Sequence, residues 1–418
     1  MKLSSALLVL TSVAGTAIAQ PEVQFDLIHG MYPLDMSADG SIMVGNDQLF
    51  DSVRWTESEG IVPLGRGTSG LGIGAGSPDI SDDGSRISAT ITTANGMFVT
   101  QGLWSEEGGW VDLMDPPPAD GGLLDLSYGS AWGLSGNGEH VVGLYWRPGN
   151  GGPGGDGLAH ASFSTPAGVT DLGSTMKDSR ANHANFDGSV VVGWDTSNSF
   201  GYWSPTVWDN GVLTHLNTNL GWAMANYVTP DGNIIGGYTF NEIFMRGEAT
   251  IWHRTESGWD QTILGVLPNT INTTLVRAMT PDASIIVGYN EYNNFNVSGF
   301  IWTAADGMQD IEDWLTDRGV EIPSTLNILD VTAISADGMI IAGIGASTET
   351  GAPIGYRINM TPPCVADLNG DGELDFLDIS QFLADYANAN PAADLNNDGE
   401  HDFLDISAFL GAYTAGCP

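Results

Sequence analysis

A short turn motif that recurs seven times is the feature that most constrains the fold of this chain. Each copy reads Ser/Thr-x-Asp-Gly or a close variant, followed by an apolar pair, a glycine and, further on, an aromatic residue. The turns are centred on Asp39, Asp83, Asn137, Asp187, Asp231, Asp282 and Asp337. Their spacing of 44 to 55 residues predicts the blades of a propeller rather than the units of a helical solenoid.

Each repeat contains the pieces of a four-stranded sheet. The Asp-Gly or Asn-Gly dipeptide is typical of a hairpin turn, because glycine accepts the positive backbone angles that such turns need. The run after the turn, such as residues 189–192, is rich in β-branched residues and predicts a buried strand. A third strand carries the aromatic residue, and a fourth, such as residues 168–173, completes the sheet. One sheet cannot cover its own faces, so the sequence predicts a mainly β chain that folds as a seven-bladed β-propeller.

The two ends of the repeat region indicate how the ring closes. The seventh copy ends at residues 355–358 without the fourth strand that other copies carry. Residues 23–28, before the first repeat, offer a spare strand. We therefore expect residues 23–28 to pair into the seventh blade, so that chain from both ends completes one sheet.

These units resemble the HAF-type extracellular repeats of secreted bacterial proteins over roughly residues 30–358. The closest part lies between residues 308 and 338 and includes a predicted short helix that ends near Gly319. One face of that helix carries Ile311, Trp314 and Leu315. The resemblance implies a repeat architecture and a location outside the cell, and it implies no particular chemistry.

Near the C-terminus a twelve-residue acidic loop pattern occurs twice, with the two copies 27 residues apart. Each copy has oxygen-bearing side chains at odd positions, glycine at position 6 and aspartate at position 12. Calcium takes roughly six to eight oxygen ligands, and the glycine allows the sharp turn that brings the carbonyl of position 7 inward. The sequence therefore predicts two calcium ions. The candidate ligands are Asp367, Asn369, Asp371, Glu373, Asp375 and Asp378 in the first loop and Asp394, Asn396, Asp398, Glu400, Asp402 and Asp405 in the second.

Each loop runs into a helix with apolar residues at helical spacing, and neither has the entering helix of an EF-hand. Two such units ending in aspartate resemble a dockerin over residues 364–418. Dockerins bind calcium and dock onto cohesins of scaffold or cell-surface proteins, so the resemblance implies a small α-helical calcium-binding domain and a cohesin-like partner. Loop positions 10 and 11, where the partner is read, hold Phe376, Leu377, Phe403 and Leu404 instead of the usual small hydroxyl residues. The partner's identity is therefore open, and the Gly-Cys ending is closer to the dockerin-like tails of exported bacterial proteins.

The chain has two cysteines, Cys364 before the first loop and Cys417 next to the last residue. Duplicated modules with approximate symmetry bring their ends together, so we expect a disulfide that closes the helical module. On the chain-entropy account such a bond stabilises the module by roughly 4 kcal/mol. Two free thiols are the alternative, and the export signal described next favours the disulfide.

The N-terminus has the pattern of a secretory signal peptide. One lysine is followed by an apolar run over residues 3–18 and an Ala-x-Ala site, which predicts cleavage after Ala19. An uncleaved anchor is the alternative, although the run is short for a membrane span. The sequence thus predicts a secreted or cell-surface protein with no membrane span in the mature chain. The expected domains are a signal peptide, a propeller, a linker and a dockerin-like module, at residues 1–19, 20–358, 359–363 and 364–418.

The charge balance argues against one class of partner. The chain has 51 Asp and Glu against 12 Lys and Arg, a formal net charge of −39. Because a phosphate backbone demands a basic face, we expect no nucleic-acid partner. At the same time, 42% hydrophobic residues, 13 tryptophans and 56 glycines do not describe a disordered acidic chain and favour a β-rich fold with many turns.

Aromatic residues fall at two kinds of position in the repeats. Third-strand tryptophans such as Trp208 and Trp252 occupy a fixed place, which favours a packing role over a sugar-stacking role. We expect the variable segments after the second strands to form loops on one face, the candidate binding face, with tolerated loop variation as the alternative. A carbohydrate is the ligand class considered there. The aromatic residues of that face are Tyr145, Trp146, Trp194, Tyr238 and Tyr289.

No catalytic motif is visible, and the seven histidines have no metal spacing. The first hypothesis is an exported, non-enzymatic binding or display protein tethered through its calcium-dependent module. The second is a secreted carbohydrate-active enzyme, a polysaccharide hydrolase or lyase, recruited by the same module. A pair of carboxylates with aromatic walls in the central funnel would favour the enzyme, whereas a funnel plugged by apolar side chains would favour the binding protein.

Overall fold

The computed structural model describes residues 22–69, 76–124, 126–147, 158–197, 200–216, 221–293, 296–361, 365–369, 374–396 and 398–416. The expected signal peptide and both cysteines lie outside these residues. The chain divides into two compact units, a strand-rich unit of Gln24–Asn359 and a helical unit within Met360–Pro418. Within the described ranges, no helix is long and apolar enough to cross a membrane.

The described residues of the strand-rich unit form seven four-stranded antiparallel sheets. Blades one to three contain β2 (Tyr32–Met36), β3 (Ile42–Asn46), β4 (Ser52–Thr56) and β5 (Gly60–Pro63), then β6 (Asp79–Ile80), β7 (Arg86–Thr92), β8 (Val99–Ser105) and β9 (Gly109–Asp112), then β10 (Gly129–Leu134), β11 (Val141–Arg147), β12 (Leu158–Thr165) and β13 (Gly168–Gly173). Blades four to six contain β14 (Ser179–Ala184), β15 (Val190–Thr196), β16 (Trp203–Asp209) and β17 (Val212–His215), then β18 (Met224–Val228), β19 (Ile234–Asn241), β20 (Arg246–Thr255) and β21 (Gly258–Gly265), then β22 (Thr274–Met279), β23 (Ile285–Asn293), β24 (Asn296–Thr303) and β25 (Gly307–Asp310). Blade seven contains β26 (Leu326–Ile334), β27 (Ile340–Ser347), β28 (Pro353–Thr361) and β1 (Glu22–Ile28).

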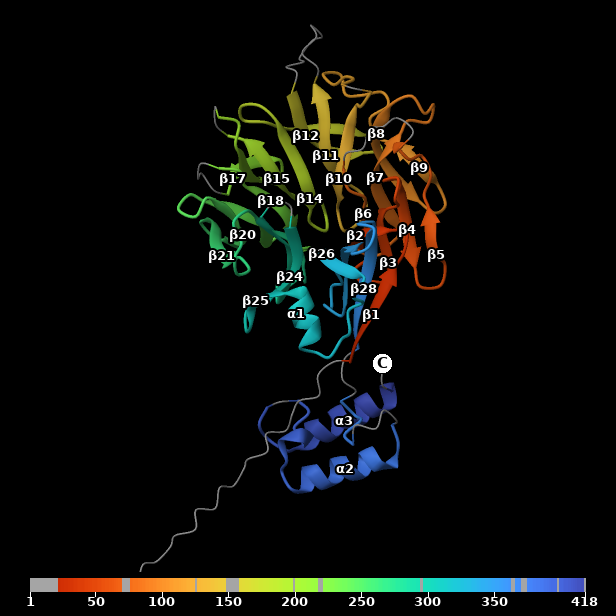
Figure 1. Cartoon of the computed structure of the whole chain (residues 1–418), viewed down its shortest axis with the longest axis vertical. Helices are drawn as coiled ribbons and strands as arrows, with labels where there is room; N and C mark the ends of the chain where they lie inside the picture. The colour runs from red at the N-terminus through yellow and green to blue at the C-terminus, as the bar shows by residue number, and fades with distance from the viewer. Residues whose placement is uncertain are drawn as a thin grey trace, which may run out of the picture. The chain divides into compact units, whose positions relative to one another are not determined.

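The first strand of each blade faces the axis and contacts the first strands of its neighbours, so the sheets fan around a centre (Figure 1). The strands β26 and β2 also meet, which joins the seventh blade to the first. The prediction of a seven-bladed β-propeller is therefore confirmed. Packing seven sheets in a ring buries both faces of each blade, which one sheet cannot do alone.

The ring closes as predicted, with the N-terminal strand β1 on the outer edge of the seventh blade beside β28 (Figure 1). Phe25 of β1 stacks on Tyr356 of β28 with ring centroids 5.5 Å apart. Strand β28 continues to Thr361, so residues 359–361, expected in the linker, belong to the sheet, because Met360 is buried and Asn359 pairs with Ile340. The rest of the expected linker, residues 362–363, lies outside the described residues.

The repeated turns have the expected positive backbone angle, for example φ of +68° at Gly40. In the first turn, Asp39 Oδ1 accepts hydrogen bonds from Ser37 Oγ at 2.6 Å and from the Ser41 N–H at 3.0 Å. These bonds, led by the one from Ser37, hold the pKa of Asp39 below its ordinary value. The residue after the turn serine links neighbouring blades, since the Ala38 N–H donates to the Asp82 carbonyl at 2.9 Å. The motif therefore stabilises both the hairpin and the ring.

A β-bulge in the inner strand explains the glycine that ends each apolar pair. In six of the seven blades, the described pairing skips one residue of the inner strand opposite this glycine. In blade four, a Cβ on Gly193 would lie 2.0 Å from the carbonyl oxygen of Arg180. The same approach, between 1.9 and 2.2 Å, occurs at Gly45, Gly143, Gly237, Gly288 and Gly343. Only glycine permits a backbone contact this close.

The third-strand tryptophans pack inside the blades, as predicted. Trp208 and Trp252 have no exposed surface, and the Trp208 indole N–H donates to the Leu172 carbonyl at 2.9 Å. The predicted short helix is α1 (Ile311–Thr316). Its buried residues are Ile311, Trp314 and Leu315, as the sequence predicts.

The helical unit contains α2 (Phe376–Ala387), a 3₁₀ turn η2 (Pro391–Ala393) and α3 (Phe403–Ala415). Its core pairs residues 27 positions apart, because the two halves repeat the same sequence pattern. Phe382 of α2 and Phe409 of α3 stack with ring centroids 4.2 Å apart and planes 3° from parallel. Ala366 and Ala393 form the second equivalent pair in this core.

We expect Gly193→Ala to destabilise the propeller by about 3 kcal/mol, because the new methyl group must displace the backbone of the inner strand. All 13 tryptophans precede residue 315, so denaturant unfolding followed by tryptophan fluorescence reports on the propeller alone. Gly108→Ala, in an exposed turn where the nearest atom is a serine Oγ at 3.0 Å, is the matched control. Equal stability of the two variants would contradict the close-contact account.

Candidate functional site

The inner strands enclose an axial channel made of two adjoining cavities of about 330 and about 280 Å³. Both volumes lie near the lower end of those found for small-molecule sites, which start at roughly 300 Å³. The two cavities share five residues, one from each of five inner strands: Asp35, Asp79, His183, Tyr227 and Ala278. The funnel is therefore open and is not plugged by apolar side chains.

The channel wall is built from rings of residues at fixed offsets from the repeated turn. Three residues before each turn-opening residue lies a position that in six blades is the residue added by the bulge. Its seven members, which we call the bulge ring, all line the larger cavity. The bulge ring is Leu34, Pro78, Trp132, Asn182, Asn226, Arg277 and Thr332. Because a bulge re-aims the extra side chain, it turns the six bulge residues toward the axis.

Two further rings line the smaller cavity. The residues immediately before the seven turn-opening residues form an apolar ring. The residues immediately after the turn-opening residues form a second ring of mostly small or cyclic residues. The apolar ring is Met36, Ile80, Leu134, Ala184, Val228, Met279 and Ile334. The ring after the turn is Ala38, Asp82, Gly136, Phe186, Pro230, Pro281 and Ala336. The polar groups are therefore concentrated between the apolar ring and the bulge ring.

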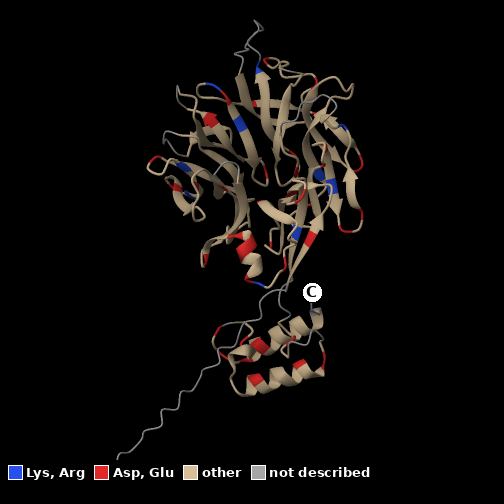
Figure 2. Cartoon of the chain, viewed as in Figure 1, with Lys and Arg blue, Asp and Glu red and all other residues tan. Residues whose placement is uncertain are grey.

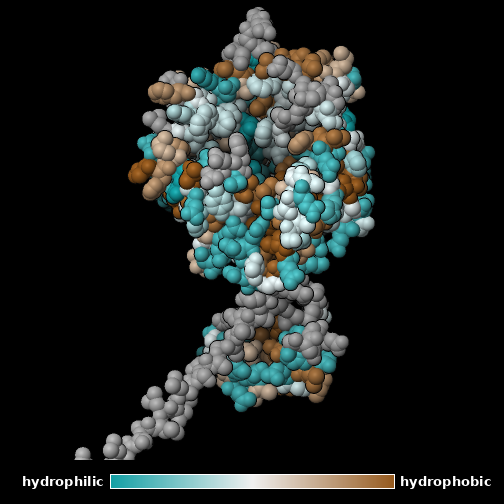
Figure 3. Space-filling model, in the orientation of Figure 1, coloured by the Kyte–Doolittle hydropathy of each residue, from teal (hydrophilic) through white to brown (hydrophobic). Residues whose placement is uncertain are grey.

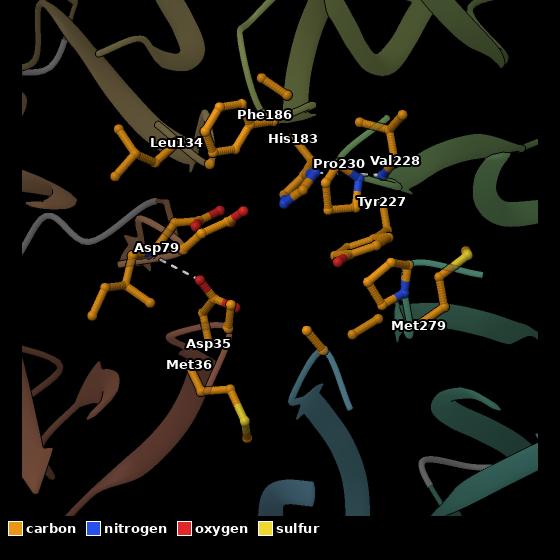
Figure 4. A pocket seen from close by; sticks show the side chains of 18 of the residues that line it. Asp35, Met36, Asp79, Leu134, His183, Phe186, Tyr227, Val228, Pro230 and Met279 are labelled. Carbon is orange, nitrogen blue, oxygen red and sulfur yellow. Dashed lines mark hydrogen bonds between the residues drawn. The ribbon is translucent and has the colours of Figure 1, made fainter. Parts of the chain in front are cut away.

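Asp35 and Asp79 lie on one side of the channel and face His183 and Tyr227 on the other (Figure 4). Asp35 Oδ2 accepts a hydrogen bond from the Ile80 N–H at 2.9 Å. The carboxyl groups of Asp35 and Asp79 lie close enough to influence each other's ionisation. Burial, and then the charge of Asp35, raise the pKa of Asp79 well above its ordinary value. The pair therefore keeps a proton at pH values where an exposed aspartate has lost its own.

His183 stacks on Tyr227 with ring centroids 4.5 Å apart and planes at 25°. Its Nδ1 accepts a hydrogen bond from the Val228 N–H at 3.4 Å, which leaves the proton of the neutral ring on Nε2. Burial lowers the pKa of His183 to about 4. Burial also raises the pKa of Tyr227, so at neutral pH the channel holds an uncharged imidazole and an uncharged phenol. Both groups can take part in hydrogen bonding or proton transfer.

The bulge-ring end of the channel is basic. The Arg180 guanidinium lies 3.6 Å from the centre of the Trp132 ring, and its Nε donates to Asn182 Oδ1 at 2.7 Å. Arg277 Nη2 pairs with Asp330 Oδ2 at 2.9 Å. Burial, and then the charge of Arg277, lower the pKa of Arg180 to about 10, still charged at neutral pH. One mouth of the channel thus carries positive charge while its middle carries acidic groups.

The five aromatic residues expected on exposed loops lie instead in the second strands, so their expected placement is wrong. Tyr145 and Trp146 belong to β11, Trp194 to β15, Tyr238 to β19 and Tyr289 to β23. These strands pair further than the sequence pattern indicates, for example Tyr145 with His160 and Trp194 with Pro205. Tyr145, Trp194 and Tyr238 are buried, whereas Tyr289 lines the larger cavity. Of these five residues, Tyr289 is the one that lines the channel.

The described parts of the two acidic loops use their side chains to hold the loop and helix backbone. Asp375 and Asp402 cap the helices, and Asp378 and Asp405 are buried partners in the same capping boxes. In the second loop, the Gly399 N–H donates to Asp394 Oδ2 at 2.9 Å. Asp371 and Glu373 of the first loop lie outside the described residues. Among the residues described, no three His, Cys, Asp or Glu side chains gather as a metal group.

The four residues expected to contact a partner are exposed on the helical unit. Phe376 and Phe403 are each 74% exposed, and Leu377 and Leu404 are 57% and 56% exposed. On the visible face of this unit, apolar atoms lie beside a hydrophilic band (Figure 3). The two copies therefore present the same apolar pair at the start of each helix.

No family model matches the chain, and no curated protein matches it. Solved propellers match its fold. Oligogalacturonate lyase from Vibrio parahaemolyticus is 11% identical, with a TM-score of 0.51 over 82% of this chain and 99% of its own. An oligogalacturonate lyase in complex with manganese is 10% identical, with a TM-score of 0.51 over 83% of this chain and 99% of its own. TolB from Acinetobacter baumannii is 11% identical, with a TM-score of 0.39. The match covers 78% of this chain and 63% of the TolB chain. Likeness at these identities shows the β-propeller fold alone.

The channel residues were missed by sequence reasoning, which named no carboxylate pair. Asp35 and Asp79 come from blades one and two and are 44 positions apart, so neither suggests the other locally. The available signal was their shared offset, two residues before the turn-opening serine. Aligning the repeats at that offset also places His183 and Tyr227 in the same ring.

We expect the free energy of unfolding to fall as the pH drops from 6.5 toward 4, because His183 is neutral when folded and takes up a proton when unfolded. The stability linked to His183 is present above pH 6.5 and lost as the pH falls through about 4, and it amounts to at most about 3 kcal/mol. His183→Phe, which keeps a ring on Tyr227, should flatten this slope in urea unfolding followed by tryptophan fluorescence. Exposed His253→Phe is the control, and an unchanged slope in His183→Phe would contradict the assignment.

Proposed function

We propose that the protein is an exported binding protein in two parts. Its propeller, built of HAF-type repeats, binds a ligand in the axial channel, and its dockerin-like module docks onto a cohesin-like surface or scaffold partner when calcium is bound. The observation that carries the docking role is the repeated exposure of the same apolar pair, Phe376–Leu377 and Phe403–Leu404. The axial channel, which is lined by both polar and apolar side chains, supports the binding role.

The exposed pairs extend along their helices. Leu383 and Leu410, seven residues after the phenylalanines, are 59% and 53% exposed. Residues seven apart lie on one side of an α-helix, so each half of the module carries a short apolar stripe. Exposed apolar surface of this kind is typical of a protein interface, because water contact with it is unfavourable until a partner covers it.

The calcium proposal is supported by charge and by donor chemistry. Residues 362–418 contain eleven acidic residues and no Lys or Arg. The only charged side chains of α2 and α3 are therefore acidic (Figure 2). Mutual repulsion of these groups opposes folding until a cation offsets it. The loop residues supply carboxylate and amide oxygens, the ligands that calcium prefers. The residues that would hold the second ion are Asp394, Asn396, Asp398, Glu400, Asp402 and Asp405.

We expect the full chain to bind two calcium ions in titration calorimetry and to gain helical circular dichroism as it does. The double variant Asp394→Asn, Asp398→Asn should lose one of the two ions, because it removes two charges from one loop only. Asp385→Asn, which removes an acid of α2 outside both loops, is the control and should keep both ions. Unchanged helicity on chelation would contradict the calcium proposal.

The docking role is separated from calcium binding by a second variant. Replacing Phe376, Leu377, Phe403 and Leu404 by serine should leave the calcium titration intact. The same variant should abolish calcium-dependent capture of a cohesin-like surface protein, because the apolar stripes are lost. Capture that persists in this variant, or in the presence of a chelator, would remove the docking proposal.

A second candidate function, a carbohydrate-active enzyme, is favoured by the Asp35–Asp79 pair. A carboxylate pair with aromatic walls is what an enzyme requires of this funnel, and Tyr227, Phe186 and Trp132 supply such walls. Two-carboxylate hydrolysis needs the groups at least about 5 Å apart, whereas Asp35 and Asp79 are near enough for each to shift the pKa of the other. The pair therefore supports proton transfer in an elimination, as in a lyase, better than hydrolysis. The oligogalacturonate lyases of the same fold are consistent with a lyase on this scaffold.

If the chain is a lyase, we expect it to produce unsaturated sugar ends from a uronate polymer, seen as a rise in ultraviolet absorbance. Asp79→Asn should reduce the rate by roughly 100-fold or more, because it removes a proton-transfer group. Asp260→Asn, an exposed acid on β21, is the control. If the wild-type chain forms no product from any uronate polymer, the lyase hypothesis is contradicted and the binding-protein hypothesis remains.

A further inference from the structure

Arg180 is a cation that the described residues leave without a carboxylate. Its one described hydrogen bond is from Nε to Asn182 at 2.7 Å, so the terminal nitrogens retain donors that face the larger cavity. It lies between two indoles, 3.6 Å from the Trp132 ring centre and 5.5 Å from that of Trp194. This packing fixes the position of the guanidinium before any ligand arrives. A positioned guanidinium with unused donors is suited to holding a carboxylate in a forked pair.

A line of aromatic side chains leads from Arg180 to the surface of blade four. Trp194, 6% exposed, stacks on Trp203 with ring centroids 4.4 Å apart and planes at 18°. Trp203 meets the edge of Trp222 at 4.7 Å, and Trp222 is 46% exposed. The ring of Tyr202 lies edge-on to Trp222, with ring centroids 5.7 Å apart. The aromatic line is therefore continuous from the basic mouth of the channel to solvent.

We propose that Arg180 binds the carboxylate of a uronic acid unit at the channel mouth and that the aromatic line from Trp203 to Trp222 carries the adjoining sugars of an acidic polysaccharide. This proposal rests on the proposed role of the channel as the propeller's binding site. It adds the ligand class, a carboxylated carbohydrate, and the residues that recognise it.

Three observations favour this ligand over other anions. The cavity of about 330 Å³ fits a single sugar ring rather than a folded peptide segment. Aromatic faces pack against the apolar faces of sugar rings, and a run of them suits a chain of repeating units. A formal net charge of −39 repels polyanions in general, so an acidic ligand needs a local cation, and Arg277 lines the same cavity beside Arg180.

Asn226 and Thr332 of the bulge ring add polar groups to the same cavity. The Asn226 amide N–H donates to the Val276 carbonyl at 3.3 Å, which fixes the orientation of the side-chain amide. Thr332 Oγ1 donates to the Pro33 carbonyl at 2.8 Å. Their remaining acceptor oxygens are suited to the hydroxyl groups that every sugar ring carries. A carboxylate recognised by arginine and hydroxyls recognised by amide and hydroxyl oxygens together describe a sugar acid.

The test is titration calorimetry of the full chain with three probes: oligogalacturonate, a neutral galactan oligomer of the same length, and dextran sulfate. We expect binding of oligogalacturonate and at least about tenfold weaker binding of the neutral oligomer, which offers Arg180 no anion, and of the sulfated polymer, whose bulkier sulfate esters do not suit a cavity of single-sugar size. Arg180→Met should weaken oligogalacturonate binding by about tenfold or more. Trp222→Ala should weaken it by about fivefold through the lost stacking surface.

Arg86→Gln and Phe244→Ala, an exposed arginine and an exposed phenylalanine away from the channel, are the matched controls and should bind as the wild type does. Arg180→Lys, which keeps the charge and loses the fork, should show an intermediate loss, and it replaces Arg180→Met if that variant fails to fold. Equal binding of all three probes, binding of dextran sulfate alone, or undiminished binding in the Arg180 variants would overturn the proposal. Calcium uptake by the helical module should be the same in every variant, so failure here is distinguishable from failure of the calcium-dependent tether.

Discussion

The propeller depends on one close contact, repeated in six described blades, between a glycine of the second strand and a carbonyl of the inner strand. Since a Cβ there would approach the carbonyl oxygen within 2.2 Å at most, glycine is what allows the inner strand to carry its bulge. The bulge in turn adds one residue to the inner strand of each of these six blades and turns it toward the axis. The ring architecture and the lining of the channel therefore follow from the same backbone contact.

In the propeller, the repeated backbone sets where each ring of residues lies, and the varied side chains set its chemistry. Offsets from the turn fix where each ring lies, and the residue at each offset differs from blade to blade. The bulge ring includes Arg277, Trp132 and two asparagines, whereas the next ring brings Asp35 and Asp79 opposite His183 and Tyr227. A rigid, nearly symmetric frame thus holds an asymmetric set of groups, which is the usual way in which a propeller acquires a specific site.

Negative charge is handled differently in the two units. The turn aspartates of the propeller, such as Asp39, accept several hydrogen bonds from their own turn, which keeps them ionised at little cost. In the helical module, Asp405 accepts N–H bonds from Leu395 and Asp402, both at 2.9 Å, so part of its charge is also satisfied locally. The remaining acids of that module have no Lys or Arg in residues 362–418 to offset them, which is why a bound cation is central to the proposed tether.

Much of the architecture could be predicted from the sequence, because it depends on local patterns. The Asp-Gly turns and their spacing predicted seven blades, the missing last strand predicted closure by residues 23–28, and helical spacing predicted α1. The loop placement of Tyr145, Trp194 and Tyr238 was wrong, since strand ends depend on what the neighbouring strand can pair with. The channel also required the tertiary structure, because Asp35, Asp79 and Arg180 belong to three different blades and line one cavity only when the ring closes.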